Sequence, residues 1–214
     1  AGHELHRRKC PIDGTKIKSC IGCKSCSIMS GFGGAGAFSD GKYNITTQFG
    51  GDLHNYVGTD KALELMEYVD DVLCSMGGAD AKLYSTASSE LKTMALRNDL
   101  HLLEAKVRHL GTDRNVKILG RIYEFCREKI EMMFYSTIDD VTVEDDGSFT
   151  VVTDRGEIFG CRDLVLAMGR SGSKQIGYVC DKLGIMQKKN RVDIGVRVEL
   201  PAEVFKHITD DVYE

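Results

Sequence analysis

The chain is organised around residues 31–42, which read Gly31-Phe32-Gly33-Gly34-Ala35-Gly36-Ala37-Phe38-Ser39-Asp40-Gly41-Lys42. Five glycines in this stretch let the backbone adopt positive φ angles and let a ligand approach main-chain N–H groups that a Cβ would shield. Gly31, Gly33 and Gly36 match G-x-G-x-x-G, but the preceding residues are too polar for a buried strand and the β-branched residues 45–47 disfavour a helix. Two interpretations stay open: a ligand-binding loop and a flexible surface loop.

The composition is that of an ordinary globular protein. The chain has 214 residues, of which 42% are hydrophobic and 28% charged, enough to bury a core in one large domain or two small ones. No apolar run approaches the roughly 18 residues of a membrane span, and residues 1–9 lack the apolar core of a signal peptide. We therefore expect a cytoplasmic protein with no membrane partner. The net charge of −4 argues against nucleic acid as the main partner.

The chain has eight cysteines, and their context favours a reducing compartment over a disulfide framework. Four of them are scattered among apolar neighbours, where a free thiol behaves as a small buried hydrophobe. These four are Cys74, Cys126, Cys161 and Cys180.

The other four cysteines are clustered near the start of the chain, as Cys10 and Cys20-x-x-Cys23-x-x-Cys26. Three cysteines at this spacing can turn their thiolates toward one metal ion or cluster, and Cys10 can supply a fourth ligand. The spacing predicts a zinc site or an iron–sulfur cluster. The alternative is a loop of unliganded or redox-active thiols.

Two stretches have the three- and four-residue apolar spacing of a helix. In residues 59–76 we expect an N-cap at Thr59 or Asp60 and an end at Gly77. Residues 88–98 predict a second, shorter helix. The acids of the first helix are expected to form a solvated face, and they are Glu64, Glu67, Asp70 and Asp71.

Residues 108–113 connect a predicted strand over 101–107 to a predicted helix over 112–134. The dipole at a helix N-terminus favours a neutral imidazole, so His109 can donate a hydrogen bond to a carbonyl group of a ligand. Alternatively, Arg108 and His109 only fix the turn. The expected buried face of the helix consists of Val116, Leu119, Ile122, Tyr123, Cys126, Ile130 and Met133.

From residue 135 onward the apolar period changes to two. Strands are predicted over 136–138, 141–144, 149–153 and 157–159, with hairpin signals at Asp146-Gly147 and Arg155-Gly156. The apolar residues 163–169 predict a strand that is buried on both faces and that ends at Gly169-Arg170-Ser171-Gly172. A short helix over 175–184, a strand over 192–199 and a final helix after Pro201 complete the chain.

The helix, the meander and the predicted buried strand together resemble the second half of the FAD-binding domain in glutathione-reductase-like, two-dinucleotide-fold flavoproteins. The strand ends in Ala167-Met168-Gly169 where that family has Ala-Thr-Gly, which removes a hydroxyl. Residues 33–42, 108–113, 169–172 and 194–199, in this order and spacing, are similar to the largely uncharacterised FAD-dependent dehydrogenases. The resemblance covers nearly the whole chain.

The resemblance implies an α/β fold, more exactly an α+β fragment. It comprises part of an FAD-binding domain, with a β-meander and a central parallel strand, and a helical and strand portion of a substrate domain. Residues 1–58 would hold the cysteine-rich segment and the glycine loop, 59–110 the substrate-domain portion, 111–173 the FAD-domain portion, and 174–214 a return to the substrate domain. The strand and G-x-G-x-x-G helix for the ADP half are expected before residue 1, and a closing segment after residue 214, so the FAD site would be incomplete in this chain.

In the intact protein the resemblance implies FAD-dependent redox chemistry on a small-molecule substrate, with NAD(P)H or another electron donor, in a possible homodimer. No catalytic base is identified, and His109 and Arg197 are the candidates for substrate contact. Two rival interpretations are a cysteine-based metal or iron–sulfur module and a ligand-free dimerisation domain. The implied cofactor-binding residues are Gly33, Gly34, Gly36, Ser39, Asp40, Lys42, Ala167, Gly169 and Arg170.

Overall fold

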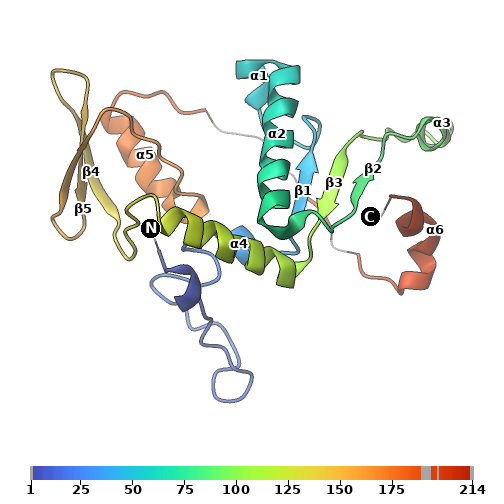
Figure 1. Ribbon diagram of the computed structural model, residues 1–214, viewed down its shortest axis with the longest axis horizontal. Coiled ribbons are helices and arrows are strands. Elements are labelled where there is room, and N and C mark those ends of the chain that lie inside the picture. Colours follow the sequence, from blue (N-terminus) through green and yellow to red (C-terminus); the bar gives the residue numbers. More distant parts are fainter. Residues whose placement is uncertain (1, 189–193, 197, 213–214) are drawn as a thin grey trace. The chain divides into compact units, whose positions relative to one another are not determined.

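The computed structural model describes residues 2–188, 194–196 and 198–212 (Figure 1). In this part of the chain the fold is mixed α/β, with two three-stranded antiparallel sheets and six α-helices. The chain divides into two compact units: unit 1 comprises Ala1–Ala37 and Tyr123–Asp193, and unit 2 comprises Phe38–Ile122 and Ile194–Glu214. Each unit has its own sheet and its own apolar core. The four-part division implied by the resemblance stays a prediction.

The sheet of unit 2 contains β1 (Lys42–Ile45), β2 (Leu83–Ser85) and β3 (Lys106–His109). The central strand is β3, which pairs antiparallel with β1 on one edge and β2 on the other. The strand predicted over 101–107 is thus found later, at residues 106–109. These are the residues whose backbone pairs with a strand on each side.

Helix α2 (Thr59–Leu73) lies beside β1 and follows the short helix α1 (Leu53–Val57) (Figure 1). Its N-cap is Gly58, at a φ of 83°, and not Thr59 or Asp60. The helix ends in one wider turn, η3 (Cys74–Gly78), in which Gly77 has a φ of 108°. The helix thus ends at the predicted glycine. Leu73 packs in the core of unit 2 with Ala81, Leu110 and Ile118.

The prediction that all four acids of α2 are solvated is wrong for Asp70. Asp70 is only 7% exposed, and both of its oxygens accept from the Arg108 guanidinium of β3, at 2.7 and 2.8 Å. Arg108 also donates to the carbonyl of Ala81, and its hydrogen bond with Asp70 raises the Arg108 pKa. A buried guanidinium requires such a partner, and Asp70 supplies it from the inward side of the helix.

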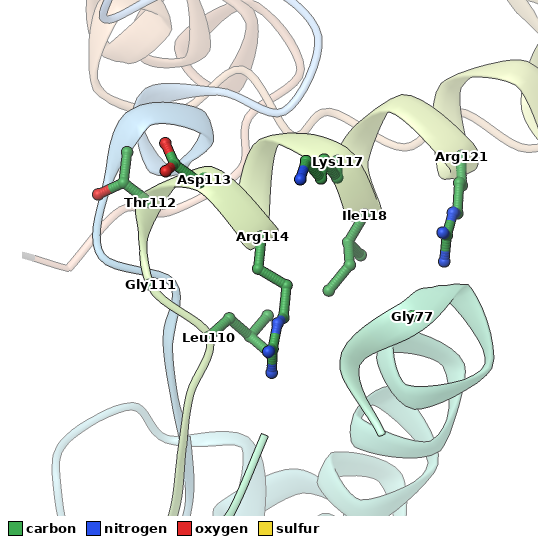
Figure 2. Close-up of a pocket in the computed structure, with 9 residues that line it drawn as sticks. All are labelled: Gly77, Leu110, Gly111, Thr112, Asp113, Arg114, Lys117, Ile118 and Arg121. Atoms are coloured by element: carbon green, nitrogen blue, oxygen red, sulfur yellow. The ribbon is translucent and has the colours of Figure 1, made fainter. Parts of the chain in front are cut away.

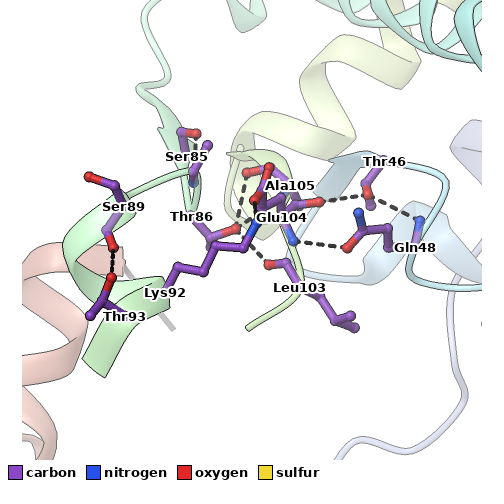
Figure 3. A network of polar contacts seen from close by, with 11 residues as sticks. Thr46, Gln48, Ser85, Thr86, Ser89, Lys92, Thr93, Leu103, Glu104 and Ala105 are labelled. Carbon is purple, nitrogen blue, oxygen red and sulfur yellow. Dashed lines mark hydrogen bonds and ion pairs between the residues drawn. The ribbon is translucent and has the colours of Figure 1, made fainter. Parts of the chain in front are cut away.

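Helix α3 (Ser89–Arg97) begins as predicted, with the Ser88 hydroxyl accepting from the Leu91 N–H at 3.3 Å. A polar network holds the chain around it (Figure 3). In that network the Thr86 hydroxyl donates to the Leu103 carbonyl at 2.8 Å, and the Thr46 hydroxyl donates to the Glu104 carbonyl at 2.8 Å. Side chains thus replace sheet hydrogen bonds just before β3 begins.

Helix α4 (Thr112–Arg127) is shorter than the predicted helix over 112–134. Tyr123 is buried as expected, but the other buried positions are Asn115 and Ile118, which the expected face did not include. Ile130, expected to be buried, is 59% exposed. The chain leaves helical geometry before Tyr135, whose φ is 55° and whose N–H donates to the Gly2 carbonyl at 3.0 Å.

The predicted meander is confirmed in unit 1. It consists of β4 (Ile138–Val143), β5 (Phe149–Thr153) and β6 (Ile158–Cys161), paired antiparallel in chain order. The hairpin glycines Gly147 and Gly156 have φ angles of 82° and 77°. Helix α5 (Ser173–Lys182) places Val179 against Val141 and Val151, and these three side chains form the core of the unit.

The predicted central parallel strand over 163–169 is wrong. The segment is not a strand in the structure, although Leu164 and Leu166 pack against the valine core while Val165 between them is 87% exposed. A strand requires a neighbour that pairs with its backbone, and in the described part of the chain no strand pairs with these residues. Alternate residues of this segment pack against the core and those between them face solvent, so the segment buries one face only.

Three residues of the predicted strand over 192–199 lie outside the described part of the chain, among them Arg197. The other five, 194–196, 198 and 199, are not a strand. Helix α6 (Ala202–Val212) follows Pro201, as predicted. No helix among the described residues is long and apolar enough to cross a membrane.

Arg8 organises the start of unit 1. Its side chain is 6% exposed and donates to the carbonyls of Ser27, Ile28 and Phe32, at 2.8, 2.6 and 2.6 Å. Phe32 also donates its N–H to the His3 carbonyl at 3.0 Å. The short helix η1 (Leu5–Arg7) precedes Arg8. One buried cation therefore ties the cysteine-rich segment to the beginning of the glycine loop.

Candidate functional site

The end of the glycine loop meets the turn before α4 within unit 2. The Leu110 N–H donates to the Gly41 carbonyl at 3.0 Å, and the Thr112 hydroxyl donates to Asp40 Oδ1 at 3.3 Å. Lys42 of β1 is the cross-strand partner of His109 of β3. The structure thus brings three candidates from two distant stretches of sequence, Asp40, Lys42 and His109, to one end of one sheet.

Gly41 makes this approach possible. Its φ is 62°, in the left-handed region, and a Cβ at this position would lie 2.9 Å from Asn115 Cβ and 3.1 Å from Leu110 Cβ. Any other residue would be strained both by its own backbone and by the first turn of α4. The close approach of residue 41 to Asn115 and Leu110 therefore requires glycine at position 41.

Asn115 anchors the other side of the same contact. It is 1% exposed and accepts a hydrogen bond from the Tyr43 hydroxyl at 2.9 Å, which links β1 to α4. Burial raises the pKa of Tyr43, so the hydroxyl stays protonated and continues to donate. This hydrogen bond holds the N-terminal turn of α4 against β1.

A cavity of about 570 Å³ opens beside the N-terminal half of α4 (Figure 2). Its size is within the usual range for small-molecule sites, roughly 300–1,000 Å³. The lining residues all belong to unit 2 and are Gly77, Leu110, Gly111, Thr112, Asp113, Arg114, Lys117, Ile118 and Arg121. The cavity thus begins where Thr112 meets Asp40.

The cavity is lined by three cations and one acid. Arg114, Lys117 and Arg121 recur at three- and four-residue intervals on α4. Figure 2 shows Arg121 projecting toward the turn that contains Gly77 and Arg114 extending beside Leu110, whereas Asp113 lies on the opposite side of α4. In the described part of the chain neither Arg114 nor Lys117 makes an ion pair or a side-chain hydrogen bond. The cavity is therefore locally positive although the chain has a net charge of −4.

The far rim of the cavity is held by Arg121 and the turn η3. The Arg121 guanidinium donates to the Met76 carbonyl at 2.8 Å. A Cβ at position 77 would lie 2.0 Å from Arg121 Nη1, so the guanidinium occupies space that exists only because residue 77 is glycine. Arg121 is exposed, and this hydrogen bond holds its guanidinium beside the turn.

The other implied cofactor-binding residues lie elsewhere in the chain. Gly33, Gly34, Gly36, Ala167 and Gly169 belong to unit 1, while the Ser39 hydroxyl, in unit 2, accepts from the Gly41 N–H at 3.3 Å. Gly33, Gly34 and Gly169 have positive φ angles, of 80°, 59° and 61°. The backbone at Arg170 begins η4 (Arg170–Gly172), and the candidate Arg197 lies outside the described residues. Whether these residues contact a cofactor stays a prediction.

The metal site at the four N-terminal cysteines stays a prediction. All eight cysteines are free thiols; Cys20 and Cys23 are exposed, and Cys10 and Cys26 are half-buried. Among the described residues no group of three or more His, Cys, Asp or Glu side chains is arranged to hold a metal ion. The loop between Cys10 and Cys20 is shaped by Asp13, whose Oδ1 accepts from the N–H groups of residues 15–17, and these bonds lower the Asp13 pKa.

Sequence reasoning missed the cations of α4 and the buried Asn115. The helical period of residues 112–127 was interpreted from its apolar positions alone. The same period applied to the charges would have placed Arg114 and Arg121 on one face, as i and i+7. Nothing in the sequence marks Asn115, because its burial depends on Tyr43 and Gly41, more than 70 residues earlier.

Comparison with known proteins assigns no function. No protein-family model and no solved structure match the chain. An uncharacterised protein of Clostridium beijerinckii is 28% identical over 183 residues, which cover 83% of this chain and 27% of that protein. The chain thus spans about a quarter of the length of this relative.

Proposed function

We propose that this chain is part of an FAD-dependent oxidoreductase, as its resemblance to two-dinucleotide-fold flavoproteins implies. The observation that carries the proposal is the path of the chain from the meander through residues 163–168 into the turn at Gly169. That turn is compact: Gly169 has a φ of 61°, and a Cβ at Gly172 would lie 2.3 Å from Met168 Cβ. Helix α5 begins directly after it without a side-chain cap, so its first main-chain N–H groups would donate to an anionic group of the cofactor.

The glycine loop fits a cofactor on steric grounds. A Cβ at Gly34 or Gly36 would meet no atom within 4 Å, so the backbone has open space beside it. Gly33, Gly34 and Gly36 would lie against the flavin or its phosphates; the Gly34 N–H itself donates to the Gly31 carbonyl at 2.9 Å. The resemblance also implies Ser39, Asp40 and Lys42 as cofactor-binding residues. When bound, FAD supplies hydride or electron transfer, and the protein supplies position and electrostatics.

His109 is the residue that we propose for substrate contact. It follows the buried Arg108 in β3 and lies across from Lys42, close to the first turn of α4. A ring N–H of the imidazole can donate a hydrogen bond to a carbonyl group of a small-molecule substrate. Arg197 stays the second candidate. The electron donor would be NAD(P)H or another reductant, and the adenine end of FAD would be bound by residues outside this chain.

Flavin content of the full-length protein tests the proposal. We expect anaerobically purified protein to show the visible absorption of flavin and to release FAD on denaturation. Gly36→Ala should lower flavin content without lowering the melting temperature, because no atom lies near the new methyl group. Gly160→Ala, equally open but in β6, is the matched control and should retain flavin. Protein that neither contains FAD nor takes it up contradicts the function; an unaffected Gly36→Ala contradicts only the role of the loop.

A cysteine-based function is the second candidate, and the surroundings of Cys26 favour it. The Arg8 guanidinium donates to the carbonyls of Ser27 and Ile28, the two residues that follow Cys26. A positive charge at this place would offset part of the negative charge that cysteine ligands bring to a metal ion or cluster. Metal analysis of the full-length protein and of Cys23→Ser distinguishes the alternatives. Stoichiometric zinc or iron that is lost in the variant supports a metal site, and its absence from both leaves only redox-active thiols.

A further inference from the structure

We propose that the cavity beside α4 is a binding site for a phosphate group carried by a small molecule. The site is formed by Arg114, Lys117 and Arg121 together with the first turn of α4. It lies entirely in unit 2 and does not rest on the proposed flavin site.

The first argument is electrostatic. Three cations and one acid line the cavity, in a chain whose net charge is negative. Clustered charges of one sign along a concave surface focus the field and raise the local concentration of the opposite ion. Asp113 opposes this, but Figure 2 shows its side chain directed away from Arg114 and Arg121. An anion is therefore the ligand that this cavity attracts.

The second argument is that the cations are positioned without being neutralised. The exposed Arg121 guanidinium donates one N–H to the Met76 carbonyl, a neutral acceptor that leaves its charge uncompensated. Arg114 is half-buried and makes no ion pair or side-chain hydrogen bond in the described part of the chain. Like charges three and four residues apart on a helix repel. A bound anion would reduce the repulsion among Arg114, Lys117 and Arg121.

The third argument concerns the class of anion. Two guanidinium groups present paired N–H donors that match the oxygens of a phosphate, and a helix N-terminus adds backbone N–H groups and a favourable dipole. The cavity, about 570 Å³, is larger than a phosphate group requires. The buried side chains of Leu110 and Ile118 line the remainder and offer apolar contact to the body of the ligand.

Binding of inorganic pyrophosphate to the full-length protein, measured by calorimetry at constant ionic strength, tests the inference. Succinate serves as the dicarboxylate comparison. We expect saturable pyrophosphate binding that weakens as salt increases, and binding about tenfold weaker in Arg114→Gln. Arg114→Lys should lose less, because it retains the charge. Arg127→Gln removes a charge from the same helix outside the cavity and should bind like the wild type.

Three results would overturn the inference: no binding of pyrophosphate, equal losses in Arg114→Gln and Arg127→Gln, or equal affinity for succinate. Flavin content is measured in the same preparations, because FAD also contains a pyrophosphate. A parallel loss of flavin in Arg114→Gln would assign the cavity to the flavin site and contradict a separate site. Pyrophosphate binding in protein that lacks flavin would support this inference while contradicting the proposed flavoenzyme.

Discussion

The two units stabilise their sheets in different ways. In unit 1 the core consists of three valines, Val141, Val151 and Val179, with apolar side chains around them. Unit 2 also has an aliphatic cluster, but it buries an ion pair, Arg108 with Asp70, and an amide, Asn115. Apolar contacts are non-directional, whereas buried polar groups require particular partners at particular distances.

This difference has consequences for the candidate site. The hydrogen bonds of Arg108 and Asn115 fix the end of β3 and the first turn of α4, which is where Asp40, Lys42 and the α4 cavity lie. The sheet of unit 2 therefore depends on particular polar partners, whereas the buried cation of unit 1, Arg8, holds the cysteine-rich segment and not the sheet. A polar substitution in the core beside the sheet should thus affect unit 2 more than unit 1. Four measurements test this difference between the cores of the two units.

The largest effect is expected from Asp70→Asn. The substitution leaves the Arg108 guanidinium buried without its carboxylate, and breaking a buried ion pair costs about 3–5 kcal/mol. We expect a lower free energy of unfolding by chemical denaturation and faster hydrogen exchange in α2 and β3. Asp71→Asn, on the exposed neighbouring residue, is the control. Equal stability of the two variants would show that the ion pair does not stabilise unit 2.

Val141→Ala should have the next largest effect. Val141 is fully buried, and removing two carbons from the valine core should cost about 2–3 kcal/mol, in part because it leaves a cavity. Faster exchange should be confined to β4, β5 and β6. Val165→Ala removes the same atoms from a side chain that is 87% exposed and should change stability little. A cost above that of Asp70→Asn would reverse the comparison between the units.

Gly41→Ala should cost about 1–2 kcal/mol from the left-handed backbone alone, and more if Asn115 cannot shift. Gly120→Ala in the middle of α4 is the control: it meets no atom within 4 Å and should stabilise the helix by about 0.5–1 kcal/mol. Thermal unfolding of the two variants should therefore shift in opposite directions. A neutral Gly41→Ala would mean that the contact between residue 41 and Asn115 is loose.

The smallest effect concerns acid stability. A hydrogen bond from Lys182 lowers the pKa of Asp140, which links β4 to α5. A lowered pKa in the folded state stabilises the protein above the unfolded pKa, about 3.9, and this contribution is lost as pH falls through the lower folded value. Stability measured from pH 6 downward should therefore fall less steeply in Asp140→Asn than in Asp139→Asn. High salt should reduce the difference because the pair is partly exposed.

Much of unit 1 could be predicted because its signals are local. Asp146-Gly147 and Arg155-Gly156 specify tight turns, and alternating apolar residues specify the strands between them, so the meander was predicted from neighbouring residues alone. The strand predicted over 163–169 is wrong because an apolar run fits both a strand buried on two faces and a segment that buries only one. Residues 163–168 are apolar enough for a strand buried on both faces, yet they bury only one.

Unit 2 shows the limit of such reasoning. The inward position of Asp70 depends on Arg108, which is 38 residues later, and the burial of Asn115 depends on Tyr43, which is 72 residues earlier. No local pattern distinguishes these residues from solvated acids and amides. The sequence singled out Asp40, Lys42 and His109 separately, whereas their proximity results from the antiparallel register of β1 and β3.

The contact between Gly77 and Arg121 also has an evolutionary consequence. The Arg121 guanidinium lies where a side chain at position 77 would be, but it is the movable end of a long side chain, whereas the φ of 108° at Gly77 disfavours any other residue there. We therefore expect homologues to keep glycine at position 77 even where position 121 varies. A glycine kept beside a variable position 121 would mean that selection acts on the backbone of this turn more than on the charge of the cavity rim.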